Sequence, residues 1–276
     1  MEITINGKAA DITLESEKNL GDFLTGIEQW LERGGHRISG IRLDGEDITA
    51  DALAGSLDRN LRDIKTIAIK TLGWPELAAE ALLYTLEDIK TWQKASFADR
   101  DLIRQGWGKS VAAGFLKEQI PDIFAGVEKT LSGEGLSPAA FQRLIEERLR
   151  ELTDPYGELK NIEPLVTTIA GRLEDLPLDI QTGKDGRTAE TLQLFSQVAE
   201  KLFRLFYSLK SHGSDVLTIE SRSVQNFIEE FGAVLKELMA AYEVKDTVLV
   251  GDLAEYELAP RFVSLYTTLK GPITIP

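Results

Sequence analysis

The amino-acid sequence predicts an α+β protein, in which a small N-terminal α+β domain precedes a mainly α-helical bundle domain. Apolar residues alternate with polar ones in the first part of the chain, as in strands with one buried face. From Pro75 onward they recur at steps of three and four, as on one face of a helix. The segment Gly73-Trp74-Pro75-Glu76 separates the two patterns and suits a helix start. It predicts a boundary between domains of residues 1–72 and 75–276.

The first domain is expected to begin with a β-hairpin and a helix. Residues 3–5 and 12–14 alternate on either side of an Asn6-Gly7 turn, which is typical of a hairpin. A helix follows and ends at Gly34-Gly35, where glycine tolerates a left-handed backbone. The apolar face of this helix comprises Leu20, Phe23, Leu24, Ile27, Trp30 and Leu31.

The rest of this domain is predicted to be a second hairpin, a short helical turn and a last strand. The hairpin covers residues 41–48 and has an Asp44-Gly45 turn. The helical turn covers residues 51–56, and residues 64–70 form the last strand.

This order of elements resembles the β-grasp, or ubiquitin-like, fold, and the resemblance covers residues 1–72. In ubiquitin-like modifiers a terminal diglycine follows the last strand. Here Leu72-Gly73-Trp74-Pro75 stands there and the chain continues, so conjugation is not implied. The resemblance implies a docking module in front of another domain.

Helices are predicted for most of the remaining chain. Their expected ranges are 75–94, 99–119, 122–131, a helix that starts at Ser137-Pro138 and ends before Asp154-Pro155, and one around 162–173 that ends at Leu176-Pro177. Residues 179–186 are expected to form an irregular loop.

Two successive segments between residues 187 and 242 carry the same apolar spacing, which predicts an antiparallel helix hairpin. The first comprises Leu192, Phe195, Ala199, Leu202, Phe206 and Leu209, and the second comprises Val224, Phe227, Phe231, Val234, Leu238 and Ala241. A last helix is expected over residues 246–270, with a kink because Pro260 cannot donate a hydrogen bond to the Tyr256 carbonyl.

The composition excludes several kinds of chemistry and partner. The chain has no cysteine, which excludes disulfides, thiolate nucleophiles and thiolate metal sites. A net charge of −14 argues against nucleic acid and anionic membranes. No segment has the apolar length of a membrane span, and the first ten residues lack the pattern of a signal peptide. We therefore expect a soluble, cytoplasmic protein without a cofactor.

Asp252, Glu255 and Tyr256 form the first candidate functional surface. Their helical spacing could bring two carboxylates and a phenol to one face for metal binding or acid–base chemistry. No Glu-x-x-His pair occurs, so a di-iron site of the usual kind is missing. The simpler interpretation is that the two acids are solvated near a helix N-terminus and that Tyr256 packs at the edge of the core.

Thr182, Gly183 and Lys184 form the second candidate, an anion-binding loop before a helix. The spacing of a P-loop is absent, so a turn that starts a helix is favoured.

The two histidines and a group of aromatic residues have simple structural interpretations. His36 and His212 are expected at the surface or at helix ends. Core or interdomain packing is favoured for the aromatic group, although such residues also anchor protein interfaces. The group comprises Trp74, Trp92, Trp107, Phe97 and Phe115.

The sequence favours a non-enzymatic interaction or adaptor protein that binds a protein partner through a helix groove or a sheet edge. One alternative is a carboxylate-based enzyme or metal-binding protein in the helical domain. Another is a small-molecule sensor with an apolar pocket in the bundle. The helix faces also permit a homodimer. An adaptor should expose a large apolar or aromatic patch and contain no buried cluster of carboxylates, an enzyme should have a cleft with strongly perturbed pKa values, and a sensor should enclose a sizeable closed cavity.

Overall fold

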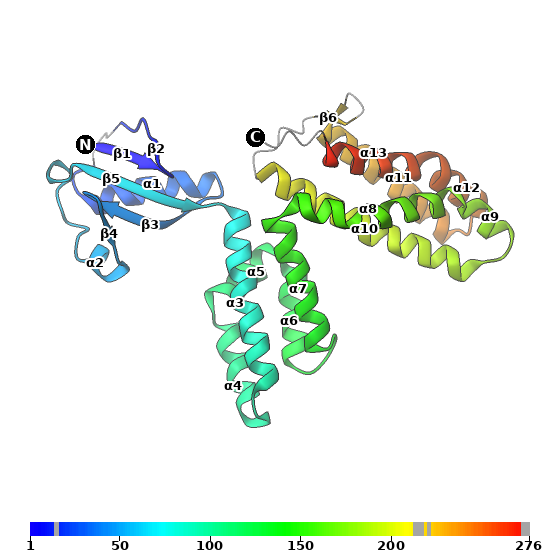
Figure 1. The fold of residues 1–276 in the computed structure, drawn as a ribbon, viewed down its shortest axis with the longest axis horizontal. Helices are drawn as coiled ribbons and strands as arrows, with labels where there is room; N and C mark the ends of the chain where they lie inside the picture. The colour runs from blue at the N-terminus through cyan, green and yellow to red at the C-terminus, as the bar shows by residue number, and fades with distance from the viewer. Residues whose placement is uncertain (14–16, 212–217, 220–221, 272–276) are drawn as a thin grey trace. The chain divides into compact units, whose positions relative to one another are not determined.

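The structure is a computed structural model that describes residues 1–13, 17–211, 218–219 and 222–271 of the 276-residue chain. The chain forms two compact units, Met1–Gln142 (unit 1) and Arg143–Pro276 (unit 2). A small N-terminal sheet followed by helices confirms the predicted α+β class (Figure 1). The predicted domain boundary at residues 72–75 lies inside unit 1, between a strand and a helix, and stays a prediction.

Unit 1 contains β1 (Glu2–Ile5), β2 (Lys8–Ala9), α1 (Leu20–Arg33), β3 (Arg37–Leu43), β4 (Glu46–Ile48), α2 (Ala50–Ala54), a 3-10 turn (Leu61–Asp63), β5 (Thr66–Leu72), α3 (Trp74–Lys94), α4 (Phe97–Gly108), α5 (Val111–Gln119) and α6 (Pro121–Leu131). The helix α7 (Pro138–Thr153) begins in unit 1 and ends in unit 2. Unit 2 continues with α8 (Pro155–Glu174), α9 (Leu176–Gln181), α10 (Asp185–Ser211), β6 (Thr218–Ile219), β7 (Arg222–Ser223), α11 (Val224–Glu243), α12 (Thr247–Asp252), a π-helix (Leu253–Leu258) and α13 (Ala259–Lys270).

The sheet of unit 1 has the strand order β2-β1-β5-β3-β4, with β1 and β5 parallel and the other neighbours antiparallel. Both predicted hairpin turns are confirmed. Asn6-Gly7 and Asp44-Gly45 have positive φ at both residues, as a type I′ turn requires. The second strand of the first hairpin was predicted at the wrong residues, because β2 covers Lys8–Ala9, directly after the turn, and Ile12 lies outside any strand. Leu14 lies outside the described residues.

The helix α1 covers one face of the sheet (Figure 1). The side chain of Asn19 caps its first turn by accepting a hydrogen bond from the Asp22 N–H at 2.8 Å. The predicted inner face is buried except for Trp30, which is exposed. The prediction for Trp30 was wrong because its position lies at the edge of the apolar stripe.

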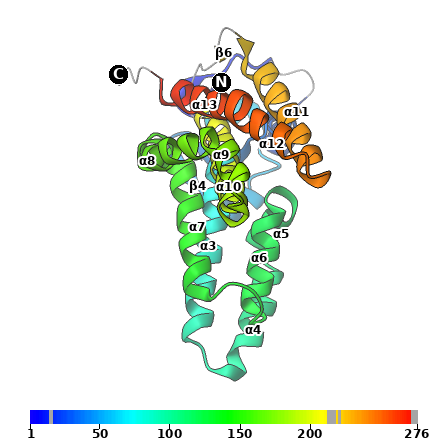
Figure 2. The same ribbon diagram turned by 90° about the vertical axis from the view of Figure 1, so that its right-hand side faces the viewer.

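The helices α3, α5 and α6 run side by side (Figures 1 and 2). The indole of Trp107 donates a hydrogen bond to Thr85 Oγ1 at 3.2 Å and stacks on Phe124. The single helix predicted for residues 99–119 is wrong, because the chain breaks into α4 and α5. Gly106 and Gly108 weaken the helix, and the Ser110 hydroxyl caps a new one by accepting from the Ala113 N–H at 3.1 Å.

The packing of α6 in unit 1 makes Gly126 intolerant of a side chain. A Cβ atom there would lie 2.5 Å from Cε2 of the buried Phe141 ring. Gly126→Ala is therefore expected to destabilise the protein by about 1–3 kcal/mol, although alanine favours a helix by about 1 kcal/mol. Urea denaturation followed by tryptophan fluorescence measures this. Gly114→Ala is the matched control, because nothing lies near its added Cβ, and it should be neutral or stabilising. Equal stability of the two variants would contradict the packing argument.

The core of unit 2 is formed by α8, α10, α11 and α13. The ring centroids of Phe195 and Phe262 lie 5.3 Å apart, and those of Phe203 and Phe231 lie 5.6 Å apart. The hydroxyl of Tyr266 donates a hydrogen bond to the Leu159 carbonyl, which joins α13 to α8. The helices α10 and α11 cover the predicted segments between residues 187 and 242, and the rings of Phe203 and Phe231 meet between them. Because α10 packs mainly on α8, the side-by-side packing of α10 and α11 as a hairpin stays a prediction.

The end of α8 follows the prediction, whereas the loop expected further along the chain does not. The helix α8 ends at Glu174, just before Leu176-Pro177, and these two residues begin the short helix α9, since proline suits the first turn of a helix. The irregular loop expected over residues 179–186 is only a turn of residues 182–184, because α9 extends to Gln181 and α10 begins at Asp185.

The C-terminal helical run is interrupted by a π-helical segment rather than by a simple bend. This segment, Leu253–Leu258, lies just before Pro260, which has no N–H to bond the Tyr256 carbonyl. The pairing of β6 with β7 was not predicted.

Candidate functional site

The first candidate site is a groove between α3 and α5 in unit 1, with a volume of about 630 Å³. The indole of Trp74 donates to Gln119 Oε1 at 3.2 Å, which joins the start of α3 to the end of α5, so the two helices run antiparallel. We call this the α3–α5 groove. Its apolar lining comprises Trp74, Leu77, Ala81 and Tyr84 from α3 and Val111, Ala112 and Phe115 from α5.

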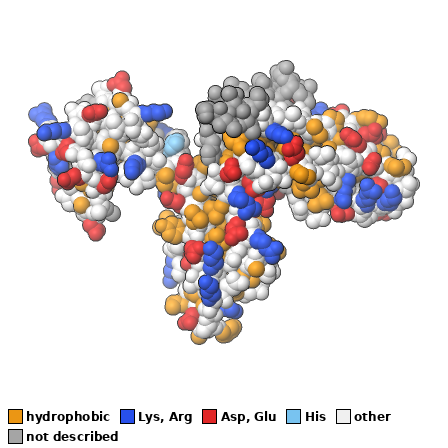
Figure 3. All heavy atoms as spheres, viewed as in Figure 1, with side chains coloured by type: hydrophobic (Ala, Val, Ile, Leu, Met, Phe, Trp, Pro, Cys, Tyr) orange, Lys and Arg blue, Asp and Glu red, His pale blue; other side chains and the backbone are white. Residues whose placement is uncertain are grey.

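The apolar lining is unusually open. Tyr84 exposes 68% of its surface and Val111 exposes 87%. Gly114 also lines the groove, and a Cβ atom added there would have no neighbour within 4 Å. Figure 3 shows hydrophobic side chains gathered over α3 in one view. An exposed apolar surface of this kind is typical of an interaction site.

The charged residues around the α3–α5 groove are mainly acidic. Glu32, Glu80 and Glu118 line it, whereas Arg37 is its one lining arginine and His36 its one lining histidine. None of the three glutamates has an ion-pair partner among the described residues. Their carboxylates are therefore free to meet a positively charged ligand.

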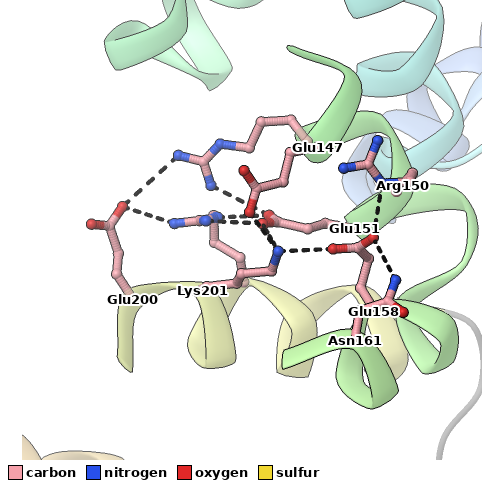
Figure 4. A network of polar contacts seen from close by, with 9 residues as sticks. Glu147, Arg150, Glu151, Glu158, Asn161, Glu200 and Lys201 are labelled. Atoms are coloured by element: carbon pink, nitrogen blue, oxygen red, sulfur yellow. Dashed lines mark hydrogen bonds and ion pairs between the residues drawn. The ribbon is translucent and has the colours of Figure 1, made fainter. Parts of the chain in front are cut away.

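The second candidate site is a network of charged residues in unit 2 (Figure 4), which we call the Glu151 cluster. Its residues come from three helices. They are Glu147, Arg148, Arg150 and Glu151 from α7, Glu158 and Asn161 from α8, and Glu200, Lys201 and Arg204 from α10.

Two cations of α10 make the central contacts. Lys201 Nζ lies 2.5 Å from Glu147 Oε1, 2.8 Å from Glu158 Oε2 and 3.8 Å from Glu151 Oε1. Arg204 holds the Glu151 carboxylate in a fork, with Nε donating to Oε2 at 2.7 Å and Nη2 donating to Oε1 at 3.0 Å. On the far side, Arg150 Nε donates to Glu158 Oε1 at 2.8 Å.

The two buried glutamates titrate differently. Burial raises the pKa of Glu151 to about 7, with Glu147 and Glu158 adding to the effect while Arg148 and Lys201 oppose it. Burial also opposes charge on Glu158, but hydrogen bonds from Lys201 and Arg150 bring the pKa of Glu158 below its usual value. Despite its own burial, Lys201 has a raised pKa because it donates to Glu147 and Glu158. Lys201 therefore stays charged.

The Glu151 cluster is arranged to hold helices together. Glu151 and Glu158 expose 2% and 4% of their surface, so a substrate could reach them only if α7 or α10 moved. Each buried carboxylate is held by at least one cation. The raised pKa of Glu151 is a feature that an enzyme would need. The ion pairs of the cluster, however, join α10 to α7 and α8 and so hold these three helices together.

The residues of the first predicted site do lie together. Asp252 ends α12, and Glu255 and Tyr256 follow in the π-helix. A hydrogen bond with Glu255, and the charge of Asp252, raise the pKa of Tyr256. Tyr256 exposes 65% of its surface, so the three residues form an open surface. Their suggested role stays a prediction.

The predicted anion loop is occupied by an internal ion pair. Lys184 Nζ lies 3.1 Å from Oδ1 of the buried Asp179, and Arg187 Nε lies 2.9 Å from its Oδ2. Thr182 donates its hydroxyl proton to the Leu178 carbonyl, and Gly183 has a φ of +70°. Lys184 and Arg187 therefore already neutralise the buried carboxylate of Asp179.

The predicted aromatic group divides into two sets. Trp92 and Trp107 are buried, whereas Trp74, Phe97 and Phe115 are exposed or partly exposed. His36 is at the surface as expected, and His212 lies outside the described residues.

The described residues contain neither a metal-binding group of side chains nor a membrane-spanning helix. In that part of the chain, no group of three or more His, Asp or Glu residues is placed to hold a metal ion. No helix there is long and apolar enough to span a membrane.

The Glu151 cluster was not predicted from the sequence. One signal was available, because Lys201 falls between Val198 and Leu202 on a largely apolar helix face. A charged residue at such a position needs a partner when the helix packs. The identity of that partner depends on the fold.

Comparison with known proteins gives two partial family matches. Residues 1–73 match a family model described as "TP0873 N-terminal domain", and residues 158–268 match one described as "Domain of unknown function (DUF8042)". The chain is also similar to an "Uncharacterized protein" of Treponema pallidum (strain Nichols), with 21% identity over 267 residues, which cover 94% of this chain and 92% of the relative. No solved structure matches the chain significantly.

Proposed function

We propose that the protein is a non-enzymatic interaction or adaptor protein that binds a partner protein in the α3–α5 groove. The observation that carries this proposal is the apolar lining of the α3–α5 groove, which remains exposed within unit 1 and which we call the seam. Tyr84 and Val111 are mostly exposed there, and a Cβ atom added to Gly114 would have no neighbour within 4 Å. Aromatic side chains beside an open groove are typical anchors for a helical ligand.

The N-terminal sheet supports a docking role of the β-grasp kind. Its order β2-β1-β5-β3-β4, with parallel central strands and α1 on one face, is consistent with the resemblance to the β-grasp fold. The first family match ends at residue 73, which supports a domain boundary at residues 72–75. The edge strands are short, and Asp47 of β4 is paired with Arg42. For this reason we favour the groove over the sheet edge as the binding surface.

The composition supports a protein as the partner. A net charge of −14 disfavours nucleic acid and anionic membranes. We also propose a cytoplasmic location and no cofactor. The Glu151 cluster counts against an adaptor, which was expected to contain no buried cluster of carboxylates, and it favours the alternative of a carboxylate-based enzyme. The burial of Glu151 and Glu158 and their ion pairs favour a structural role for the cluster instead.

Filling the α3–α5 groove is expected to abolish partner binding. In Gly114→Trp, the indole would occupy the open space over α5 without a clash at its Cβ. Full-length wild type and variant serve as baits in a native lysate, and quantitative mass spectrometry compares the captured proteins. A partner that binds in the groove should fall by roughly tenfold or more, as for loss of an interface anchor.

Two controls make this experiment specific. Gly114→Ala should retain the partner, because a methyl group leaves most of the groove open. Gly106→Trp places the same indole on another exposed helix glycine, with nothing within 4 Å of its Cβ. If Gly114→Trp retains every partner of the wild type, the groove is not the binding surface.

A further inference from the structure

We infer that the occupant of the α3–α5 groove is a basic amphipathic helix of a partner protein. This inference rests on the proposed function and names the chemistry of the ligand. It depends on three properties of the groove, which are the spacing of its apolar residues, its length and the charge along its sides.

The spacing of the seam suits a helix. On α3 the apolar residues follow one another at steps of three, four and three, as the a and d positions of a coiled coil do. Residues 111 and 115 give α5 a matching step of four. Two antiparallel helices with such faces form a trough that accepts the side chains of a third helix.

The length of the seam sets the size of the ligand. From Trp74 to Tyr84 the helix rises by about 15 Å, which equals nearly three helical turns. A ligand helix would therefore place anchors at positions i, i+3 or i+4, and i+7.

The charges along the groove favour basic residues beside the apolar anchors of the ligand. Glu80 extends from α3 and Glu118 from α5, and Glu32 lies at the end of α1. These three carboxylates have no ion-pair partner among the described residues. Lysine or arginine beside the apolar anchors would meet them, and aspartate or glutamate would be repelled.

The same charge argues against a second copy of this chain as the occupant. The chain carries 45 acidic and 31 basic residues. A pair of α3–α5 grooves facing each other would bring six lining glutamates together, against two lining arginines. A different molecule of opposite charge is the better fit.

Three synthetic peptides of about 18 residues test this inference by fluorescence anisotropy with the full-length protein. The first has leucine and phenylalanine anchors at the spacing above, with lysine elsewhere. The second replaces every lysine with glutamate. The third keeps the composition of the first but contains two central prolines, which prevent a helix.

The basic helix is expected to bind, and the glutamate and proline peptides should bind at least about tenfold more weakly. The variant Glu80→Lys/Glu118→Lys should reverse the preference between the lysine and glutamate peptides. The control Glu128→Lys/Glu134→Lys makes the same change in net charge at exposed positions outside the groove. It should keep the wild-type preference, which separates recognition in the groove from general attraction to an acidic protein.

Each failure has a different meaning. If the lysine and glutamate peptides bind equally and Gly114→Trp abolishes both, the inference about charge is wrong while the groove remains the binding surface. If both glutamate-to-lysine pairs change the preference equally, the attraction is general and the inference is wrong. If the basic helix does not bind, or if Gly114→Trp binds it like wild type, the inference is also wrong. The capture experiment then decides separately whether the proposed function survives.

Discussion

Lys201→Met is expected to destabilise unit 2 by about 3–5 kcal/mol near pH 8, the usual effect of removing one partner from a buried ion pair. Methionine keeps the length and the apolar stem of the side chain. It removes the ammonium group that lies 2.8 Å from Glu158 and 2.5 Å from Glu147. The buried carboxylate of Glu158 would then have Arg150 as its remaining ion-pair partner.

Chemical denaturation read separately in the two units measures this effect. All four tryptophans, Trp30, Trp74, Trp92 and Trp107, lie in unit 1, so their fluorescence reports unit 1. Hydrogen exchange of α10 reports unit 2. The expected loss appears in α10, while the tryptophan transition changes little.

Two further measurements make the Lys201 result specific. Lys236→Met removes an exposed lysine from α11 and should cost less than about 0.5 kcal/mol. Lowering the pH to about 5 should recover part of the loss in Lys201→Met, because an unpaired buried carboxyl group takes up a proton. A loss of less than about 1 kcal/mol near pH 8 would show that the Glu151 cluster contributes little to the fold.

Glu151 is expected to make unit 2 less stable as the pH rises from about 4.5 to about 7. Burial raises its pKa from 4.5 to about 7 on folding, so the folded state binds the proton more tightly. The stabilising contribution is complete below the unfolded pKa and is lost as the pH rises through the folded one. The full change is on the order of 3 kcal/mol.

Glu151→Gln isolates this contribution from other titrating groups. The unfolding free energy of wild type minus that of the variant should be larger near pH 5 than near pH 8. Glu200→Gln is the control, since Glu200 contacts the same Arg204 but is largely exposed, and its difference should stay nearly constant. The opposite trend for Glu151→Gln would mean that the Arg204 fork keeps Glu151 ionised throughout this range.

The parts of the fold that depend on local chemistry could be predicted from the sequence. Asn6-Gly7 and Asp44-Gly45 adopt the positive φ angles of hairpin turns because few other residue pairs tolerate them. The helix α1 follows its apolar stripe. The break at Ser110 was missed because a serine cap competes only weakly with helix continuation, and the packing of α5 on α3 decides between them.

The candidate sites depended on tertiary structure and could be predicted only in part. A helix was predicted over residues 75–94, but a helical pattern does not show which part of its apolar face stays open. Glu147 and Glu158 lie 54 and 43 residues from Lys201 in sequence, so no local pattern joins them. Asp179 was expected in the same irregular loop as Lys184, whereas in the structure it is a buried residue of α9. Its ion pair with Lys184 depends on this packing, which the sequence did not reveal.

Amide shifts of the full-length, ¹⁵N-labelled protein on addition of the basic amphipathic peptide test the central claim most directly. We expect the largest changes on α3 and α5, including Leu77, Tyr84 and Gly114, and we expect Gly114→Trp to suppress them. Changes confined to the edge strands β2 and β4, or to unit 2, would contradict the assignment of the α3–α5 groove as the binding surface.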